Sequence, residues 1–99
     1  MANVILKQAA IDDLNAIWEY TFEKWSENQA DKYYEMLKFS CKEIGKNPEI
    51  GKEYTTISKN LYGLHSGRHI IFYHFIDENE IEIIRILHGR MDLKNRLNE

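Results

Sequence analysis

Two apolar runs late in the chain limit its possible folds more than any other feature. Residues 67–76 and 80–92 flank the polar triplet Asp77-Glu78-Asn79, and both runs carry large apolar side chains on both of their faces. An isolated two-stranded hairpin is at best marginally stable in water. The sequence therefore predicts a hairpin that is covered twice. Helices of the same chain can cover one face, and a partner protein is expected on the other.

The register of this hairpin follows from the length of its turn. A two-residue turn at Glu78 and Asn79 places His69 opposite His88. The same register pairs Ile71 with Ile86, Tyr73 with Ile84, Ile70 with Leu87, Phe72 with Arg85, and His74 with Ile83. A three-residue loop would shift the strand register by one residue and so change every one of these pairs.

The first half of the chain has helical periodicity. Residues 3–7 predict a short strand, and a helix follows from Gln8. Its apolar face is expected to hold Leu14, Ile17, Trp18, Thr21 and Trp25, so that both tryptophans are assigned to the core. Ser26 and Gln29 have the spacing of a capping box, which starts a second helix near Glu27. With so short a connection, the two helices must form a helical hairpin.

The second helix ends near Gly45, before Asn47-Pro48. Its predicted buried stripe is Ala30, Tyr33, Tyr34, Leu37, Cys41 and Ile44. An irregular connection over residues 48–59, a strand at 61–65, the hairpin and a short helix or tail at 91–97 complete the chain. The fold class is thus α+β, in the order β-α-α-β-β-β, with the helical hairpin packed on a small, mostly antiparallel sheet. We expect residues 1–99 to form a single domain.

The arginines and histidines are concentrated in the second half of the chain. Every arginine and every histidine lies there, and arginine is suited to bidentate contacts. His69 and His88 are expected near the open end of the hairpin, but two histidines do not complete a zinc site. Arg85 lies within an apolar strand, where it can either bind a ligand or form a salt bridge with a helix carboxylate such as Glu19 or Glu23. Arg68 and Arg90 flank glycines at the strand ends and are better contact candidates.

Composition excludes several classes of protein. The net charge of −3 argues against binding to nucleic acid through bulk charge, and no specific nucleic-acid binding is expected for the chain alone. Cys41 has no disulfide partner and is expected to be a small buried thiol. No apolar run is long enough to span a bilayer, and no signal peptide is apparent, so the expected location is the cytoplasm. No metal or cofactor is expected.

The chain resembles the ParE toxins of the RelE/ParE superfamily, which belong to type II toxin–antitoxin modules and are often called plasmid stabilisation proteins. Five segments carry the resemblance in the family's order. They are Ala9–Tyr20, Ala30–Tyr33, Asn47–Gly51, Gly67–Tyr73 and Ile84–Asp92. The resemblance implies the same β-α-α-β-β-β fold. It also implies a toxin that is neutralised by a cognate, ParD-like antitoxin whose C-terminal segment wraps around it.

The resemblance allows more than one activity. ParE-like members inhibit DNA gyrase without catalysing a reaction, whereas RelE-like members cleave mRNA on the ribosome. Residues 91–99 contain neither tyrosine nor histidine, which favours gyrase inhibition. If the chain is instead an endoribonuclease, Arg68, Arg85 and His88 are its candidate catalytic residues. A non-toxic relic that only binds antitoxin is a third possibility. The predicted partner-binding residues are Arg68, His69, His88, Arg90 and Met91.

Overall fold

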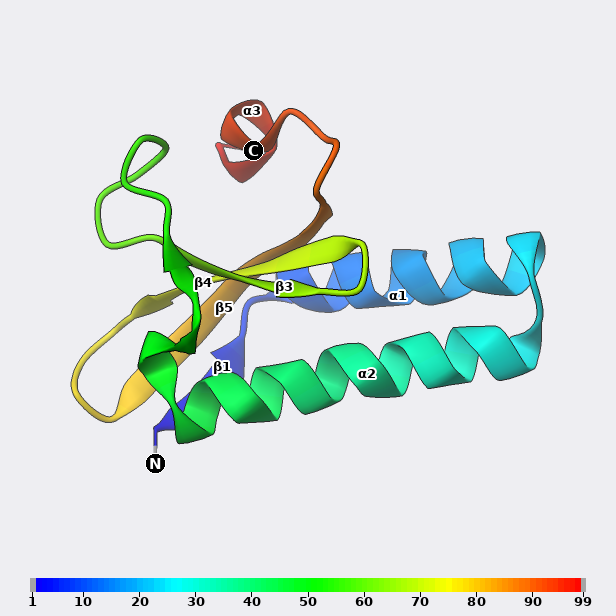
Figure 1. The fold of residues 1–99 in the computed structure, drawn as a ribbon, viewed down its shortest axis with the longest axis horizontal. Helices are drawn as coiled ribbons and strands as arrows, with labels where there is room; N and C mark the ends of the chain where they lie inside the picture. The colour runs from blue at the N-terminus through cyan, green and yellow to red at the C-terminus, as the bar shows by residue number, and fades with distance from the viewer. Residues whose placement is uncertain (1, 99) are drawn as a thin grey trace.

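A five-stranded sheet, two long helices and a short C-terminal helix make up the computed structural model, which describes residues 2–98 (Figure 1). The strand order is β1-β5-β4-β3-β2. The elements are β1 (Asn3–Leu6), α1 (Gln8–Lys24), α2 (Glu27–Lys46), a 3-10 turn (Pro48–Ile50), β2 (Lys52–Glu53), β3 (Tyr62–Ser66), β4 (His69–Phe75), β5 (Glu80–His88) and α3 (Leu93–Leu97). The predicted fold class is confirmed.

The helical hairpin forms where the sequence predicts it. The Ser26 hydroxyl accepts a hydrogen bond from the Gln29 backbone N–H at 3.1 Å and so caps α2. Ala30, Leu37, Cys41 and Ile44 are buried, as predicted. Leu37, Cys41 and Ile44 pack with strand residues such as Ile71 and Ile83 into one core between the helices and the sheet.

The two tryptophans do not lie in the core as predicted. Trp25 is 73% exposed, and Trp18 is half-buried, with its indole N–H donating to Asp31 Oδ1 at 3.0 Å. Only Ala10 and Leu14 of α1 are fully buried. The helical hairpin projects beyond the sheet at its loop end (Figure 1), so the residues near that end do not pack against the sheet.

The sheet has one strand more than the sequence predicts. Lys52 and Glu53 pair antiparallel with Gly63 and Tyr62, within the segment expected to be irregular. Two residues are too short for a periodic pattern to indicate a strand. At the opposite edge, β1 pairs in parallel with β5 and has no neighbouring strand on its other side among residues 2–98.

The hairpin register is partly as predicted. His69, Ile70, Ile71 and Phe72 pair with His88, Leu87, Ile86 and Arg85, which confirms those four pairs. The pairs Tyr73–Ile84 and His74–Ile83 are wrong, because Tyr73 lies opposite Ile83 and His74 opposite Glu82. A β-bulge next to Phe72 and Tyr73 adds one residue on β5. The connection between Ile76 and Glu80 is one residue longer than the assumed turn, and the Ile76 N–H donates to the Glu80 carbonyl at 2.9 Å. The extra residue of the bulge offsets the register shift that this longer connection introduces.

The second face of the sheet is covered by the chain itself, not left for a partner as expected. Leu61, Ile70, Phe72 and Leu87 are buried there. The residues that pack over them are Tyr54, Ile57, Ile84, Leu93 and Leu97, which come largely from the β2–β3 connection and α3. Periodicity could not indicate this cover, because the β2–β3 connection has no regular structure.

Candidate functional site

The five predicted partner-binding residues lie together in one groove at the open end of the hairpin. Arg68, His69, His88, Arg90 and Met91 line it with Tyr33 of α2 and with Ala16, Ile17, Tyr20 and Thr21 of α1. Its volume is about 590 Å³. We call this site the Arg–His groove. That it binds a partner stays a prediction.

A tight turn brings the two strands and α2 together at this groove. Gly67, between β3 and β4, has a φ of 61°, a conformation that favours glycine. A Cβ atom there would also lie 2.7 Å from the Tyr33 hydroxyl. The Gly89 N–H donates to the Arg68 carbonyl at 3.1 Å, which holds the end of β5 beside the start of β4. Arg68 and Arg90 are thereby placed at the same end of the hairpin.

Tyr33 joins the His69 ring to the start of β4. Its hydroxyl accepts a hydrogen bond from the Arg68 backbone N–H at 2.9 Å and lies 2.7 Å from His69 Nδ1. In the His69 tautomer that carries its proton on Nε2, the hydroxyl donates to Nδ1. Burial, with a smaller contribution from nearby His88, lowers the pKa of His69 to about 4. His69 is consequently neutral near pH 7.

A backbone donor sets the tautomer of His88. The Arg90 backbone N–H donates to His88 Nδ1 at 3.1 Å, so a neutral His88 carries its proton on Nε2. The two imidazole rings meet edge to face, with centroids 5.4 Å apart. A neutral His88 cannot accept a further proton on Nδ1 without breaking its hydrogen bond to the Arg90 N–H.

Arg85 does not join the groove. Its Nε and Nη2 donate to Asp13 Oδ2 and Oδ1 at 2.8 and 3.0 Å, and its Nη1 donates to the Arg96 carbonyl at 3.0 Å. The expected salt bridge to a helix carboxylate therefore exists, but Glu19 and Glu23 are the wrong partners. The first turns of α1, which carry Asp13, are the part that packs over β5. Of the three residues predicted for a ribonuclease, the structure brings together Arg68 and His88 only.

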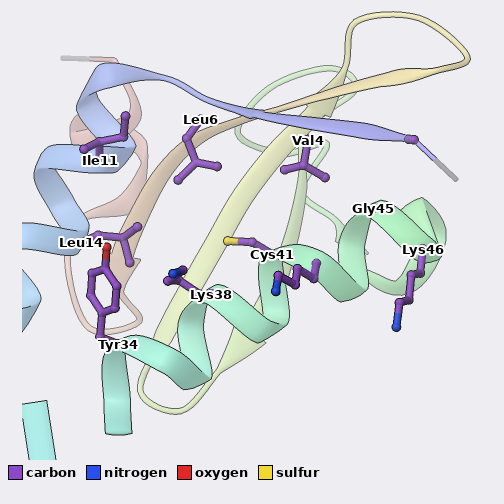
Figure 2. A pocket seen from close by; sticks show the side chains of 11 residues that line it. Val4, Leu6, Ile11, Leu14, Tyr34, Lys38, Cys41, Gly45 and Lys46 are labelled. Atoms are coloured by element: carbon purple, nitrogen blue, oxygen red, sulfur yellow. The ribbon is translucent and has the colours of Figure 1, made fainter. Parts of the chain in front are cut away.

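A second groove, which the sequence reasoning missed, lies between β1, α1 and α2 (Figure 2). Its volume is about 450 Å³, and its apolar lining includes Val4, Leu6, Ile11, Leu14 and Tyr34. Val4 and Leu6 point from β1 toward α2 in Figure 2. Lys38, Lys42 and Lys46, spaced four residues apart on α2, also line it. This spacing is visible in the sequence, but the approach of β1 is not. We call this site the lysine groove.

Cys41 also lines the lysine groove but is not reactive. The side chain is buried, and burial raises the pKa of the thiol to about 11. The thiolate is therefore scarce near neutral pH, which confirms the prediction of a small buried thiol.

Residues 2–98 offer neither a cluster of metal ligands nor a helix that could span a membrane. Over residues 2–98, His, Cys, Asp and Glu side chains form no group of three that could hold a metal ion. Within that range, no helix has the length and apolar character that crossing a membrane requires.

Comparison with known proteins identifies the family. Residues 4–93 match the family described as the ParE toxin of the type II toxin–antitoxin system parDE. Toxin ParE1 of Mycobacterium tuberculosis is 33% identical over 93 residues, which cover 94% of this chain and 95% of the relative. Toxin ParE1 of Caulobacter vibrioides is 30% identical over 92 residues, covering 93% and 94%.

The fold is also similar to a solved structure described as the chromosomal ParDE TA system from P. aeruginosa. The TM-score is 0.77 at 18% identity, and the match covers 89% of this chain and 96% of that one. At this identity the likeness concerns the fold, while the sequence matches carry the family assignment. The chain therefore belongs to the ParE toxin family of type II toxin–antitoxin systems.

Proposed function

We propose that this ParE-type toxin acts by inhibiting DNA gyrase and that a cognate, ParD-like antitoxin neutralises it. The family, described as the toxin of a type II toxin–antitoxin system, supports an antitoxin partner. Two features of the site bear on the choice between gyrase inhibition and mRNA cleavage, and a third bears on where the antitoxin binds.

The main support for a protein target is the state of the two histidines. Cleavage of RNA at a 2′-hydroxyl needs a group that accepts its proton. His88 Nδ1 already accepts a hydrogen bond from the Arg90 N–H, so a neutral His88 carries its proton on Nε2. Burial lowers the pKa of His69 to about 4, which makes this ring a weak proton acceptor. The two imidazoles of the groove are therefore poorly suited to act as a general base.

Arg85 supports the same choice. A catalytic arginine must be free to bind a phosphate, whereas Arg85 is held by Asp13 in a two-point salt bridge. The net charge of −3 is also unsuited to a protein that must hold an RNA strand. We therefore favour inhibition of a protein over RNA cleavage.

For the antitoxin, the lysine groove is the surface with the best chemical match. Its apolar floor suits aliphatic or aromatic side chains, and Lys38, Lys42 and Lys46 suit acidic residues. The edge strand β1 lies beside it and can pair with an extended segment. An acidic segment with regularly spaced apolar residues, such as a disordered antitoxin tail, fits both features.

The activity is tested with purified gyrase. Supercoiling and DNA cleavage are measured with and without the protein, and again after the antitoxin is added. We expect trapped, cleaved DNA with the toxin alone and none with the complex. Cleavage of ribosome-bound mRNA without any effect on gyrase would refute the proposal. No effect on either, together with antitoxin binding, would instead identify a relic that only binds.

The antitoxin surface is tested separately by reversing its charge. Lys38→Glu/Lys42→Glu is compared with Lys32→Glu/Lys59→Glu, which makes the same charge change at lysines outside the groove. We expect the groove variant to bind antitoxin at least tenfold more weakly in a calorimetric titration, while the control variant binds normally. Equal weakening by both variants would mean that net charge alone, and not the lysine groove, guides binding.

A further inference from the structure

We propose that the Arg–His groove binds a carboxylate side chain of the target protein together with a large apolar side chain next to it. Arg68 and Arg90 would hold the carboxylate, and Ile17 and Met91 would contact the apolar side chain. This inference rests on the proposed function in one respect, namely that the partner is a protein.

The polar groups of the Arg–His groove are mainly hydrogen-bond donors, and no carboxylate lines the groove to accept from them. Its lining includes two arginines, the two histidines and three hydroxyls, but no aspartate or glutamate. Asp13, whose charge acts on His69, is engaged by Arg85. A groove that presents guanidinium and imidazole N–H groups is complementary to an anion.

Arg68 and Arg90 are available for such an anion. Within residues 2–98, neither guanidinium has a hydrogen-bond or ion-pair partner, although both backbones are held in place. The two residues also line a smaller, polar depression of about 370 Å³ with His88 and Gly89. The anion would therefore lie where the polar depression and the Arg–His groove meet.

The remaining wall of the groove is apolar and open. It consists of Ala16, Ile17, Tyr20 and Met91, of which Tyr20 is 62% and Met91 41% exposed. Large apolar side chains that converge on a groove are typical of a binding site. An anion alone would leave this wall in water, so the occupant is expected to carry an apolar group beside its charge.

The charges around the groove favour a protein carboxylate over a nucleic acid. The groove is lined by two arginines, and a nucleic-acid backbone needs several more cations than these two. A single carboxylate needs no more than a pair of guanidinium groups.

Small probes test this chemistry without any partner protein. The full-length protein is titrated with 3-phenylpropionate, with its uncharged analogue 3-phenylpropionamide, and with inorganic phosphate, and amide and imidazole resonances are followed by NMR. We expect saturable shifts at His69, His88 and Met91 with the carboxylate, and dissociation constants at least tenfold weaker for the other two probes.

Matched variants assign the binding to the arginines. Arg68→Gln and Arg90→Gln should each weaken 3-phenylpropionate binding about tenfold, since each removes a charge-assisted contact. Lys94→Gln removes the same charge from α3, outside the groove, and should leave binding unchanged. Arg90→Lys keeps the charge but not the planar fork, so it should bind with intermediate strength.

The outcomes separate this inference from the proposed function. Equal binding of the amide, equal or tighter binding of phosphate, or no shift at the groove residues would each overturn the inference. The titration contains neither gyrase nor antitoxin, so these results would leave the gyrase proposal standing. Conversely, a toxin that does not affect gyrase could still bind the carboxylate probe here.

Discussion

The ion pair between Asp13 and Arg85 ties α1 to β5, and replacing Asp13 by Asn should be among the most destabilising polar substitutions in the protein. The carboxylate accepts hydrogen bonds from Arg85 Nε at 2.8 Å, Arg85 Nη2 at 3.0 Å and the Ile86 N–H at 2.9 Å. The two side chains are 15% and 17% exposed. Asn has a single acceptor oxygen, and its NH₂ group would face a donor of the guanidinium.

The size of the effect follows from this geometry. Breaking a fully buried ion pair by removing one partner costs about 3–5 kcal/mol. Asp13 and Arg85 keep some contact with water, and the Asn oxygen can still accept from Ile86. We therefore expect the free energy of unfolding to fall by about 2–3 kcal/mol.

Urea denaturation measures this loss. At the slope expected for a chain of this length, the midpoint should fall by roughly 2 M. Asp12→Asn is the matched control, because the Asp12 carboxylate contacts the exposed Gln8 amide, and this variant should change stability by less than about 0.5 kcal/mol. Asp13→Asn/Arg85→Met should recover part of the loss, because it leaves no guanidinium without its carboxylate.

Two results would refute this reasoning. A shift for Asp13→Asn no larger than that for Asp12→Asn would mean that the ion pair contributes nothing measurable to the fold. Loss of growth inhibition in the folded double variant would mean that Arg85 acts on the target, and RNA cleavage would again be a candidate. We expect the double variant to remain toxic.

Two further predictions concern a glycine and a histidine. Gly51→Ala should lower the free energy of unfolding by about 2 kcal/mol, because the new Cβ would overlap the Tyr73 ring and displace the hydroxyl that accepts from the Gly51 N–H. Gly89→Ala is the control in the same urea assay and should be nearly neutral, because the atoms nearest to its new Cβ lie 3.8 Å away. His69 has its pKa lowered from 6.5 to about 4, so the unfolded chain binds more protons between these values, and stability should fall as the pH falls through this window. After allowance for the partial exposure of the ring, the loss is about 1–2 kcal/mol. The pH dependence of the urea midpoint should therefore be flatter in His69→Gln, and equal slopes would contradict the assigned cause.

Local patterns predicted most of the elements and the relation between the two histidines. The apolar periodicity and the Ser26 cap are properties of neighbouring residues, so the bounds of α1 and α2 followed from them. The pairing of His69 with His88 was predicted from an assumed two-residue turn. It holds because the bulge in β5 compensates for the longer connection, and this bulge depends on packing that no local pattern encodes.

The features that could not be predicted depend on how separate segments meet. The exposure of Trp25 depends on the length of the helices relative to the sheet, which periodicity does not report. Asp13 was missed as the partner of Arg85 because the offset of α1 along β5 is a tertiary property. The lysine groove exists because β1 lies alongside α2, and the residues of β1 and α2 are far apart in the sequence.

The cover that the chain provides for its own sheet bears on how long the protein survives alone. Residues of the β2–β3 connection and α3 cover Phe72 and its neighbours, so this face of the sheet stays buried when a binding partner dissociates. A sheet without such a cover would expose apolar surface and be prone to aggregation and proteolysis. The freed protein is therefore expected to stay folded without a partner or a chaperone. Its lifetime after release is then not limited by its own unfolding.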